Sequence, residues 1–350
     1  MEWFKKIVIF SLFFIAFPLF STASEEEEHE GFNTVEYIFE HVNDSHEWHF
    51  LTIGERHISV PLPVILYSKQ SGWHFFSSAK LHHHEEGFHF YLAEGGENNG
   101  KIVEKLEDGN ETVPLDLSLT KTVLGLLIVA IIMLLFLIQG AGKAKASKGK
   151  APKGALNVTE MLVLFVRDEI AKPFGGKKYR KLLPYLLTLF TFVLLANLIG
   201  LILPLGLNVT GNIAVTATLA AITFLITSFN GNKHYWGHIV NPDVPVYMKI
   251  PIPLMPFIEL AGIFIKPIVL MIRLFANMLA GHMIVAVLIG LIFLMSAVLS
   301  PIVGAGTSII SILFSVFMVM LDLLVSFIQA YIFALLSAMY FGMATDNSGH

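Results

Sequence analysis

An arginine stands inside one of the most apolar stretches of the chain. Residues 266–295 are almost wholly apolar, yet they contain Arg273, Asn277 and His282. A charged side chain at the centre of a bilayer costs roughly 2.5–3.5 kcal/mol on insertion scales. A guanidinium cannot escape that cost by losing its proton, because its pKa stays above about 12. Either this stretch does not lie in a membrane, or the charge has a function there.

The spacing around the arginine predicts a polar stripe on one helix. Glu259, Lys266 and Arg273 follow each other at seven-residue steps, and Asn277 is four residues further on. Seven residues make about two helical turns, so these four side chains share one face. His282 is nine residues beyond Arg273 and points toward a different neighbour. For Lys266 the alternative is that its alkyl chain carries the ammonium to the bilayer surface.

A second stripe is predicted on a later helix. Asp322, Ser326 and Gln329 follow the i, i+4, i+7 pattern. Two antiparallel helices with polar stripes suggest a water-containing seam or an ion path. The alternative is ordinary hydrogen bonding between helices, which applies also to Asn197 in an earlier span. Arg273 has no carboxylate three or four residues away, although Asp322 could pair with it across the helices.

The composition places the stretch in a membrane. Of 350 residues, 55% are hydrophobic and only 14% are charged, whereas soluble domains have about 45–50% and 25%. Several apolar runs approach or exceed the ~20 residues that cross a bilayer. The chain has no cysteine, which excludes disulfides and thiolate metal sites. These features exclude a soluble domain and indicate a polytopic membrane protein.

The N-terminal third is predicted to lie outside the cytoplasm. Residues 1–23 resemble a cleaved signal peptide, with an uncleaved anchor as the alternative. Residues 24–118 form an exported segment with 19 acidic and 5 basic residues and 10 of the 14 histidines. Aromatic and β-branched residues in its middle predict short strands. The run HHHEEGFHF at 82–90 suggests metal binding, but without specific ligand spacing a polar face is favoured, and no metal site is predicted.

The membrane domain is predicted to occupy residues 119–350. Three spans are expected at 123–138, 182–206 and 211–229. The loop 141–183 has 11 basic and 3 acidic residues, so it should be cytoplasmic, and it contains an amphipathic helix at 157–174 predicted to lie along the inner membrane face. This orientation agrees with the signal peptide.

The last 95 residues contain two apolar stretches, at about 256–300 and 308–343. A helix of 45 residues is about 67 Å long, which is more than twice the hydrocarbon thickness. We therefore expect kinked or strongly tilted helices, with break points at Gly262, Pro267, Gly281 or Gly290. The predicted fold is an all-α polytopic membrane protein with upright spans, two long C-terminal helices, a small β-containing exported segment and a cytoplasmic C-terminus.

The motifs of the membrane domain resemble a known family. RLFANMLAGHMI at 273–284, Glu259 upstream, SFIQAYIFALLSAMY at 326–340 and the region 165–204 are similar to subunit a of the F-type ATP synthase membrane sector. The resemblance covers about residues 118–344 and leaves the exported segment outside.

This resemblance implies a proton-conducting stator beside a rotating c-ring of hairpin proteolipids that carry buried carboxylates. Arg273 would be the essential arginine between two offset half-channels. His282 and Asp322 would form the outer half-channel pair, and Glu259 the inner half-channel acid. Asn277 and Gln329 would accompany the arginine, and Lys266, Asn197 and Ser326 would support the site.

The resemblance also implies the partners and the limits of the chemistry. Peripheral-stalk b subunits, the bilayer and protons join the c-ring as partners, and no cofactor or nucleic acid is expected. The chain has no phosphate-binding G-x-x-x-x-G-K-[ST] motif, so it would be a non-catalytic subunit in a bacterial inner membrane. The choice of H⁺ or Na⁺ stays open. The alternative class is a stand-alone secondary transporter, although no internal repeat is visible.

Overall fold

The structure is a computed structural model that describes residues 44–345, except 54–55, 83–88, 94–97, 99, 106–110, 147–153, 203–206, 233–234 and 238–253. The predicted signal peptide and part of the histidine-rich run therefore lie outside the described residues. The chain divides into two compact units. The described part of the first unit is residues 283–319, and the second unit contains residues 42–282 and 320–350.

The described part of the segment that is predicted to be exported consists mainly of short antiparallel strands, as its alternating pattern predicts; it keeps the name exported segment below. The strands are β1 (Glu47–Ile53), β2 (Arg56–Pro61), β3 (Pro63–Ser68), β4 (Gly72–Ser77), β5 (Phe90–Leu92), β6 (Ile102–Lys105), β7 (Glu111–Thr112) and β8 (Leu115–Asp116), with the short helix α3 (Ala79–His82) after β4. They pair in the orders β1-β2, β4-β3-β8 and β5-β6-β7. Side chains from β3, α3, β5 and β6 form one apolar core.

Backbone hydrogen bonds join this segment to the first span. Helix α4 (Lys121–Ala146) begins five residues after β8. The Lys121 amide donates to the Ser45 carbonyl at 2.9 Å, and the Thr122 amide donates to Asp44 Oδ1 at 3.0 Å. These bonds satisfy two of the amides that a helix start leaves without partners. The N-terminal end of the span is thereby fixed to the residues just before β1.

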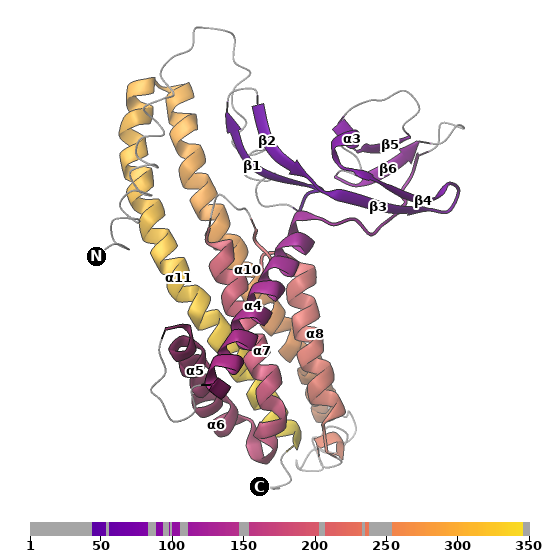
Figure 1. Cartoon of the computed structure of the whole chain (residues 1–350), viewed down its shortest axis with the longest axis vertical. Helices are drawn as coiled ribbons and strands as arrows, with labels where there is room; N and C mark the ends of the chain where they lie inside the picture. Colours follow the sequence, from indigo (N-terminus) through magenta and orange to yellow (C-terminus); the bar gives the residue numbers. More distant parts are fainter. Residues whose placement is uncertain are drawn as a thin grey trace. The chain divides into compact units, whose positions relative to one another are not determined.

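Three apolar helices correspond to the three predicted spans. Besides α4, these are α7 (Tyr179–Gly200) and α8 (Ile213–Phe229). Figure 1 shows the three helices running alongside one another. The helix α7 ends at Gly200, before the predicted end at 206, because its last turn tightens: the Ile202 amide bonds the Ile199 carbonyl, three residues back. At 17 residues, α8 is about 25 Å long, slightly less than the hydrocarbon thickness.

The predicted amphipathic helix packs on the bundle. It is formed by α5 (Ala155–Phe165), the π-helical turn η3 (Val166–Ala171) and α6 (Lys172–Phe174), followed by the 3₁₀ turn η4 (Gly176–Lys178). Val166 and Ile170 are fully buried in the same core as side chains of α7, α10 and α11. The ring of Phe165 contacts Phe190 and Phe327 at centroid distances of 5.7 and 5.8 Å. At Phe165, Val166 and Ile170 the apolar face of this helical segment is therefore covered by protein, whereas the sequence predicts that the segment lies along the membrane face.

Each of the two C-terminal stretches is one continuous helix. Helix α10 spans Leu254–Val298 and α11 spans Pro301–Thr345, 45 residues each. Helical structure continues through all four suggested break points, including Pro267. Both helices appear as single long ribbons in Figure 1. A length of about 67 Å means that neither can lie upright within a bilayer of ordinary thickness.

The turn between these helices belongs to the unit at 283–319. Ser300 Oγ accepts from the Val303 amide at 3.3 Å, and Pro301 occupies the first helical position. A serine N-cap followed by proline is a favoured helix start. For this reason α11 begins at 301, whereas the apolar pattern predicts a start near 308.

The structure confirms the predicted class, a mostly helical polytopic membrane protein with strands in its N-terminal part.

Candidate functional site

Asn197 joins three elements in the interior of the membrane domain. Its side chain is 0% exposed. Its amide nitrogen donates to the Ser326 carbonyl on α11 at 3.4 Å, and its oxygen accepts from Thr210 Oγ1 at 2.7 Å. A buried amide with both ends bonded holds its neighbours at a defined register. The structure thus brings together two predicted polar residues, Asn197 and Ser326, and adds Thr210.

Asp322 and His282 each lie against a glycine of a neighbouring helix. A methyl group at residue 281 would lie 2.7–2.9 Å from the carboxyl atoms of Asp322, so this carboxyl group would have to move to admit a larger residue. A methyl group at residue 200 would lie 3.4 Å from Nε2 of His282. The carboxylate of α11 therefore sits against the residue that precedes His282, and the imidazole sits against the end of α7.

Arg273 has no ion pair within the described part of the chain. The ion pairs among the described residues are His46–Asp116, Arg167–Asp168 and Asp168–Lys172. Arg273 is half-buried, between the fully buried Leu274 and the half-exposed Ile272. It therefore borders a side of α10 that the described residues leave uncovered.

The helix register explains why Asp322 is not the partner of Arg273. Asp322 lies opposite Gly281, which is eight residues, or about 12 Å along the axis, from Arg273. Lys266 Nζ lies 5.5 Å from the ring centroid of Tyr340, which fixes the antiparallel register at the other end. Interpolating between these contacts places Arg273 level with residues 331 and 332 of α11, between the Tyr340 end and Gln329. Gln329 is buried.

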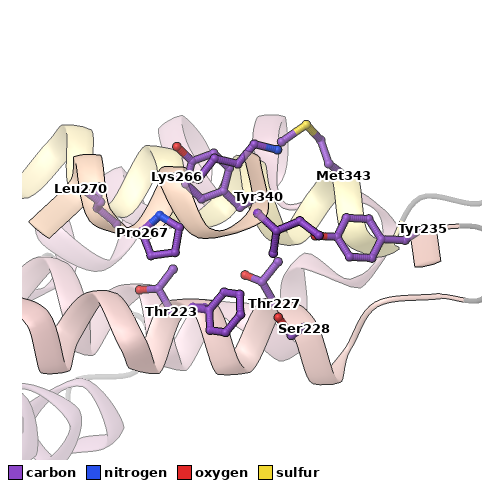
Figure 2. A pocket seen from close by; sticks show the side chains of 11 residues that line it. Thr223, Thr227, Ser228, Tyr235, Lys266, Pro267, Leu270, Tyr340 and Met343 are labelled. Carbon is purple, nitrogen blue, oxygen red and sulfur yellow. The ribbon is translucent and has the colours of Figure 1, made fainter. Parts of the chain in front are cut away.

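A pocket lies between α8, α10 and α11. It contains Lys266, which belongs to the first predicted polar stripe and contacts the ring of Tyr340. Figure 2 shows Lys266 and Tyr340 facing each other above Thr223, Thr227 and Ser228. Tyr235, just before the segment 238–253, closes the same pocket. Burial, and then the negative charge of the nearby Glu259, raise the pKa of the Tyr235 hydroxyl. Glu259 is thus close enough to the pocket to influence its electrostatics.

Of the other predicted residues, the structure leaves Asn277 exposed and Ser326 buried. Ser326 Oγ has no hydrogen-bond partner among the described residues. The predicted residues therefore fall into three places: Asn197 and Ser326 in the interior, His282 and Asp322 beside two glycines, and Lys266 and Glu259 near the pocket. Arg273 lies between the last two places along α10.

Sequence reasoning missed several small polar residues. Thr223 bonds Tyr185 Oη at 2.6 Å and Ser337 Oγ at 3.4 Å, which connects α7, α8 and α11. From the sequence, Gly281 is expected only as a possible break point of the helix. Its position directly before His282, on a helix with a polar stripe, is the feature that could have marked it as part of the site. No comparable signal distinguished Thr223, because threonines recur along α8.

The arrangement is suited to moving ions. Titratable and hydroxyl groups occur at successive levels of two antiparallel helices, around a cation that has no ion pair in the described residues. Within the part of the chain that the structure describes, four helices are long and apolar enough to cross a membrane. The fold and the site therefore define a multi-pass membrane protein with polar groups positioned along its interior.

Comparison with known proteins gives the family. Residues 123–342 match the family model described as ATP synthase A chain. The chain is 44% identical over 241 residues to ATP synthase subunit a of a Chlorobium phaeobacteroides strain, covering 67% of each chain. It is 42% identical over 243 residues to the subunit of Chloroherpeton thalassium, covering 67% of this chain and 69% of that one. It is 37% identical over 270 residues to the subunit of Myxococcus xanthus, covering 72% and 84%.

The chain belongs to the ATP synthase subunit a family. This membership confirms the resemblance of the motifs, and it supports a proton-channel role in the stator, with the c-ring and the rest of the complex as partners. Residues 37–121 match a second family model, described as a domain of unknown function. The exported segment is thus a recognised module whose role the match does not state.

Proposed function

We propose that the chain provides two offset half-channels and an essential arginine, Arg273, through which protons reach and leave the carboxylates of the c-ring. The observation that carries this proposal is the position of Arg273. It is half-buried in a long apolar helix, without an ion pair among the described residues, and beside an uncovered apolar face.

The physical reason lies in the cost of moving a charge through lipid. A protonated carboxyl can rotate through hydrocarbon, whereas an ionised one cannot do so cheaply. A fixed guanidinium lowers the pKa of an approaching carboxyl and favours release of its proton. Because it stays charged, it also repels protons and opposes a direct leak between the half-channels. A lysine would serve less well, because burial can neutralise it.

The outer route is assigned to His282 and Asp322. Supporting this assignment, the Asp322 carboxyl lies against Gly281, beside His282 in the chain, and both residues are only partly covered by protein. An imidazole titrates near pH 6.5, about the range in which a proton relay must work. The buried amide of Asn197 holds α7 against α11 one turn away.

The inner route is assigned to Glu259 and the pocket beside Lys266. Polar groups from three helices and Tyr235 line that pocket, and the charge of Glu259 influences the Tyr235 hydroxyl. Lys266 lies over the ring of Tyr340, which supports a positioning role for this ammonium. Asn277 and Gln329 remain the proposed companions of Arg273.

The remaining assignments concern placement in the cell. The protein lies in a bacterial inner membrane, with a signal peptide at 1–23, residues 24–118 outside, the loop 141–183 inside and a cytoplasmic C-terminus. The basic loop and the exported acidic segment support this orientation. Peripheral-stalk b subunits are proposed to bind the same stator.

The test is Arg273→Ala in the complete ATP synthase, with Lys266→Ala as the matched cation control on the same helix face. We expect Arg273→Ala to abolish proton-driven ATP synthesis in inverted membrane vesicles while the c-ring still co-purifies. Lys266→Ala should retain synthesis, although at a reduced rate. Wild-type synthesis by an assembled Arg273→Ala complex would overturn the proposal.

Liposomes separate the stator from a stand-alone transporter. The chain without the c-ring should conduct almost no protons under an applied potential, because the carboxylate that carries them is on the ring. Proton flux through the chain alone, at the rate of the assembled membrane sector, would favour the transporter.

A further inference from the structure

One face of the exported three-stranded sheet is apolar and open. In the antiparallel pairing of β3 with β4 and β8, Tyr67 lies between Trp73 and Leu115. In the next row, Ile65 pairs with Phe75, and its carbonyl accepts from the Leu117 amide. These six residues form a patch of two rows across three strands, called here the aromatic face. None of the six is charged.

The aromatic face is exposed in this chain. Phe75 is 70% exposed, Trp73 56%, Leu115 59% and Leu117 52%. The rings nevertheless lie in order: Trp73 is 5.0 Å from Tyr67 and 6.2 Å from Phe75 between centroids. An exposed apolar patch of this kind marks an interaction site.

The opposite face of the same sheet is already occupied. Val64 and Leu66 of β3 are buried against Leu81, Phe90 and Ile102. Figure 1 shows α3, β5 and β6 together on one side of β3 and β4. The exported segment thus has its own core, and the aromatic face is not needed to build it.

The position of the face in the chain indicates its occupant. Leu117 is four residues before Lys121, where the first span begins, so the two are at most about 13–14 Å apart. The connection is held by hydrogen bonds from Ile65 to Ser118, and from the start of α4 to residues 44 and 45. The aromatic face therefore lies within reach of the interfacial zone of the bilayer, which extends several ångströms beyond the hydrocarbon.

The residue types agree with that position. Tryptophan and tyrosine are enriched where a membrane meets water, because their rings bury an apolar body while the polar atom stays hydrated. A second copy of the segment is a poorer partner, since residues 24–118 carry 19 acidic and 5 basic residues and two copies would repel each other.

We propose that the aromatic face lies on the outer leaflet of the bilayer and anchors the exported segment to the lipid surface. The partner is the interfacial zone of the membrane itself. This inference concerns a module outside the proton path, and so it does not depend on the roles proposed for Arg273, His282 or Asp322.

The experiment uses the absence of native cysteine. Phe75→Cys and Leu117→Cys are made in the complete ATP synthase, labelled with an environment-sensitive fluorophore and reconstituted into phosphatidylethanolamine and phosphatidylglycerol vesicles. Lys101→Cys is the matched control, because this exposed residue before β6 uses only its backbone in hydrogen bonds to Ala93 and Asn98. Unchanged ATP hydrolysis checks that each labelled complex is intact.

Two quenchers read the surroundings of each label. Labels at 75 and 117 should be quenched several-fold more by lipids with a shallow nitroxide than the label at 101, and several-fold less by aqueous iodide. Equal iodide quenching at all three positions would overturn the proposal. Protection from iodide without lipid quenching would also overturn it, because a protein would then cover the face.

Discussion

At the scale of single residues, one glycine lies directly against a titratable side chain. The Asp322 carboxyl occupies the space beside Gly281, whereas a methyl group at residue 200 would be at ordinary contact distance from the His282 imidazole. Close packing against Gly281 fixes where the Asp322 carboxyl lies. Arg273, in contrast, has no ion pair among the described residues, and this is why it is the candidate partner of an acidic group on another subunit. The exposed side of α10 beside Arg273 leaves its guanidinium accessible to a partner.

Gly281→Ala should disturb the outer route directly. The added methyl would lie under 3 Å from three atoms of the Asp322 carboxyl group, so this group must move. This group is the end of a flexible, partly exposed side chain, so it can move at little cost in stability. We expect a reduced rate of proton-driven ATP synthesis with little change in thermal stability. The matched control is Gly262→Ala on the same helix, where an added methyl meets nothing within 4 Å. Equal effects of the two substitutions would contradict the role of the close approach.

At the scale of elements, buried hydrogen bonds set the register of the bundle. The Asn197 side chain connects α7 with α11 and with the loop before α8. Tyr185, Thr223 and Ser337 form a second connection among α7, α8 and α11. Helices without a hydrophobic force between them in lipid depend on such polar contacts and on close packing.

Asn197→Ala should loosen the contact between α7 and α11. It removes the second hydrogen bond to the Ser326 carbonyl and leaves the buried Thr210 hydroxyl without its acceptor. An unsatisfied buried polar group costs about 1–3 kcal/mol. We expect the purified complex to unfold at a lower temperature. Thr188→Ala is the control on the same helix, because that exposed side chain bonds only the Pro184 carbonyl. An unchanged unfolding temperature in Asn197→Ala would show that this contact does not support the bundle.

The exported sheet should respond to acid through Asp116. Burial opposes ionisation of this carboxyl, but hydrogen bonds from His46 and from Ser118 outweigh it and lower its pKa. A carboxyl with a lowered folded pKa stabilises the fold above the unfolded value near 3.9, and this contribution is lost as the pH falls through the folded value. Asp116→Asn should therefore be degraded faster by protease at pH 7, and its difference from wild type should shrink below about pH 4. A difference that stays constant down to pH 3 would contradict this assignment.

At the scale of the whole molecule, two modules meet at the start of α4. The membrane domain matches the ATP synthase A chain model, and the exported segment matches a different model. The segment has its own apolar core, whereas its connection to the span consists of backbone and side-chain hydrogen bonds at 44, 45, 121 and 122. Proton transfer is proposed to use only the membrane module.

Deleting residues 26–112, with the signal peptide retained, should leave proton-driven ATP synthesis largely intact. The deletion removes β1 to β7 and the acceptors at Asp44 and Ser45, so we expect less assembled complex and a lower unfolding temperature. Synthesis per assembled complex in inverted vesicles is the measurement. Loss of synthesis in a fully assembled deletion complex would mean that the two modules are not separable.

The sequence determined which class of protein this is. Runs of about 20 apolar residues indicate where helices can cross a bilayer, because several such runs in one chain are typical only of membrane proteins. Helical spacing groups Glu259, Lys266, Arg273 and Asn277 on one face. The strands in the exported segment also follow from local alternation. These features depend on residues close together in the chain. The structure confirms the apolar helices and the strands where it describes them, apart from the end of α7 and the start of α11.

Tertiary structure alone decided which groups meet. The contact of Asp322 with Gly281, the level of Arg273 beside residues 331 and 332, and the pocket of Lys266 and Tyr340 depend on the register of α10 against α11. The covered face of η3 and the unbroken helix through Pro267 likewise depend on packing. A periodic pattern gives the face of each helix but not its position along a neighbour, because sliding by one turn preserves the pattern and changes every contact.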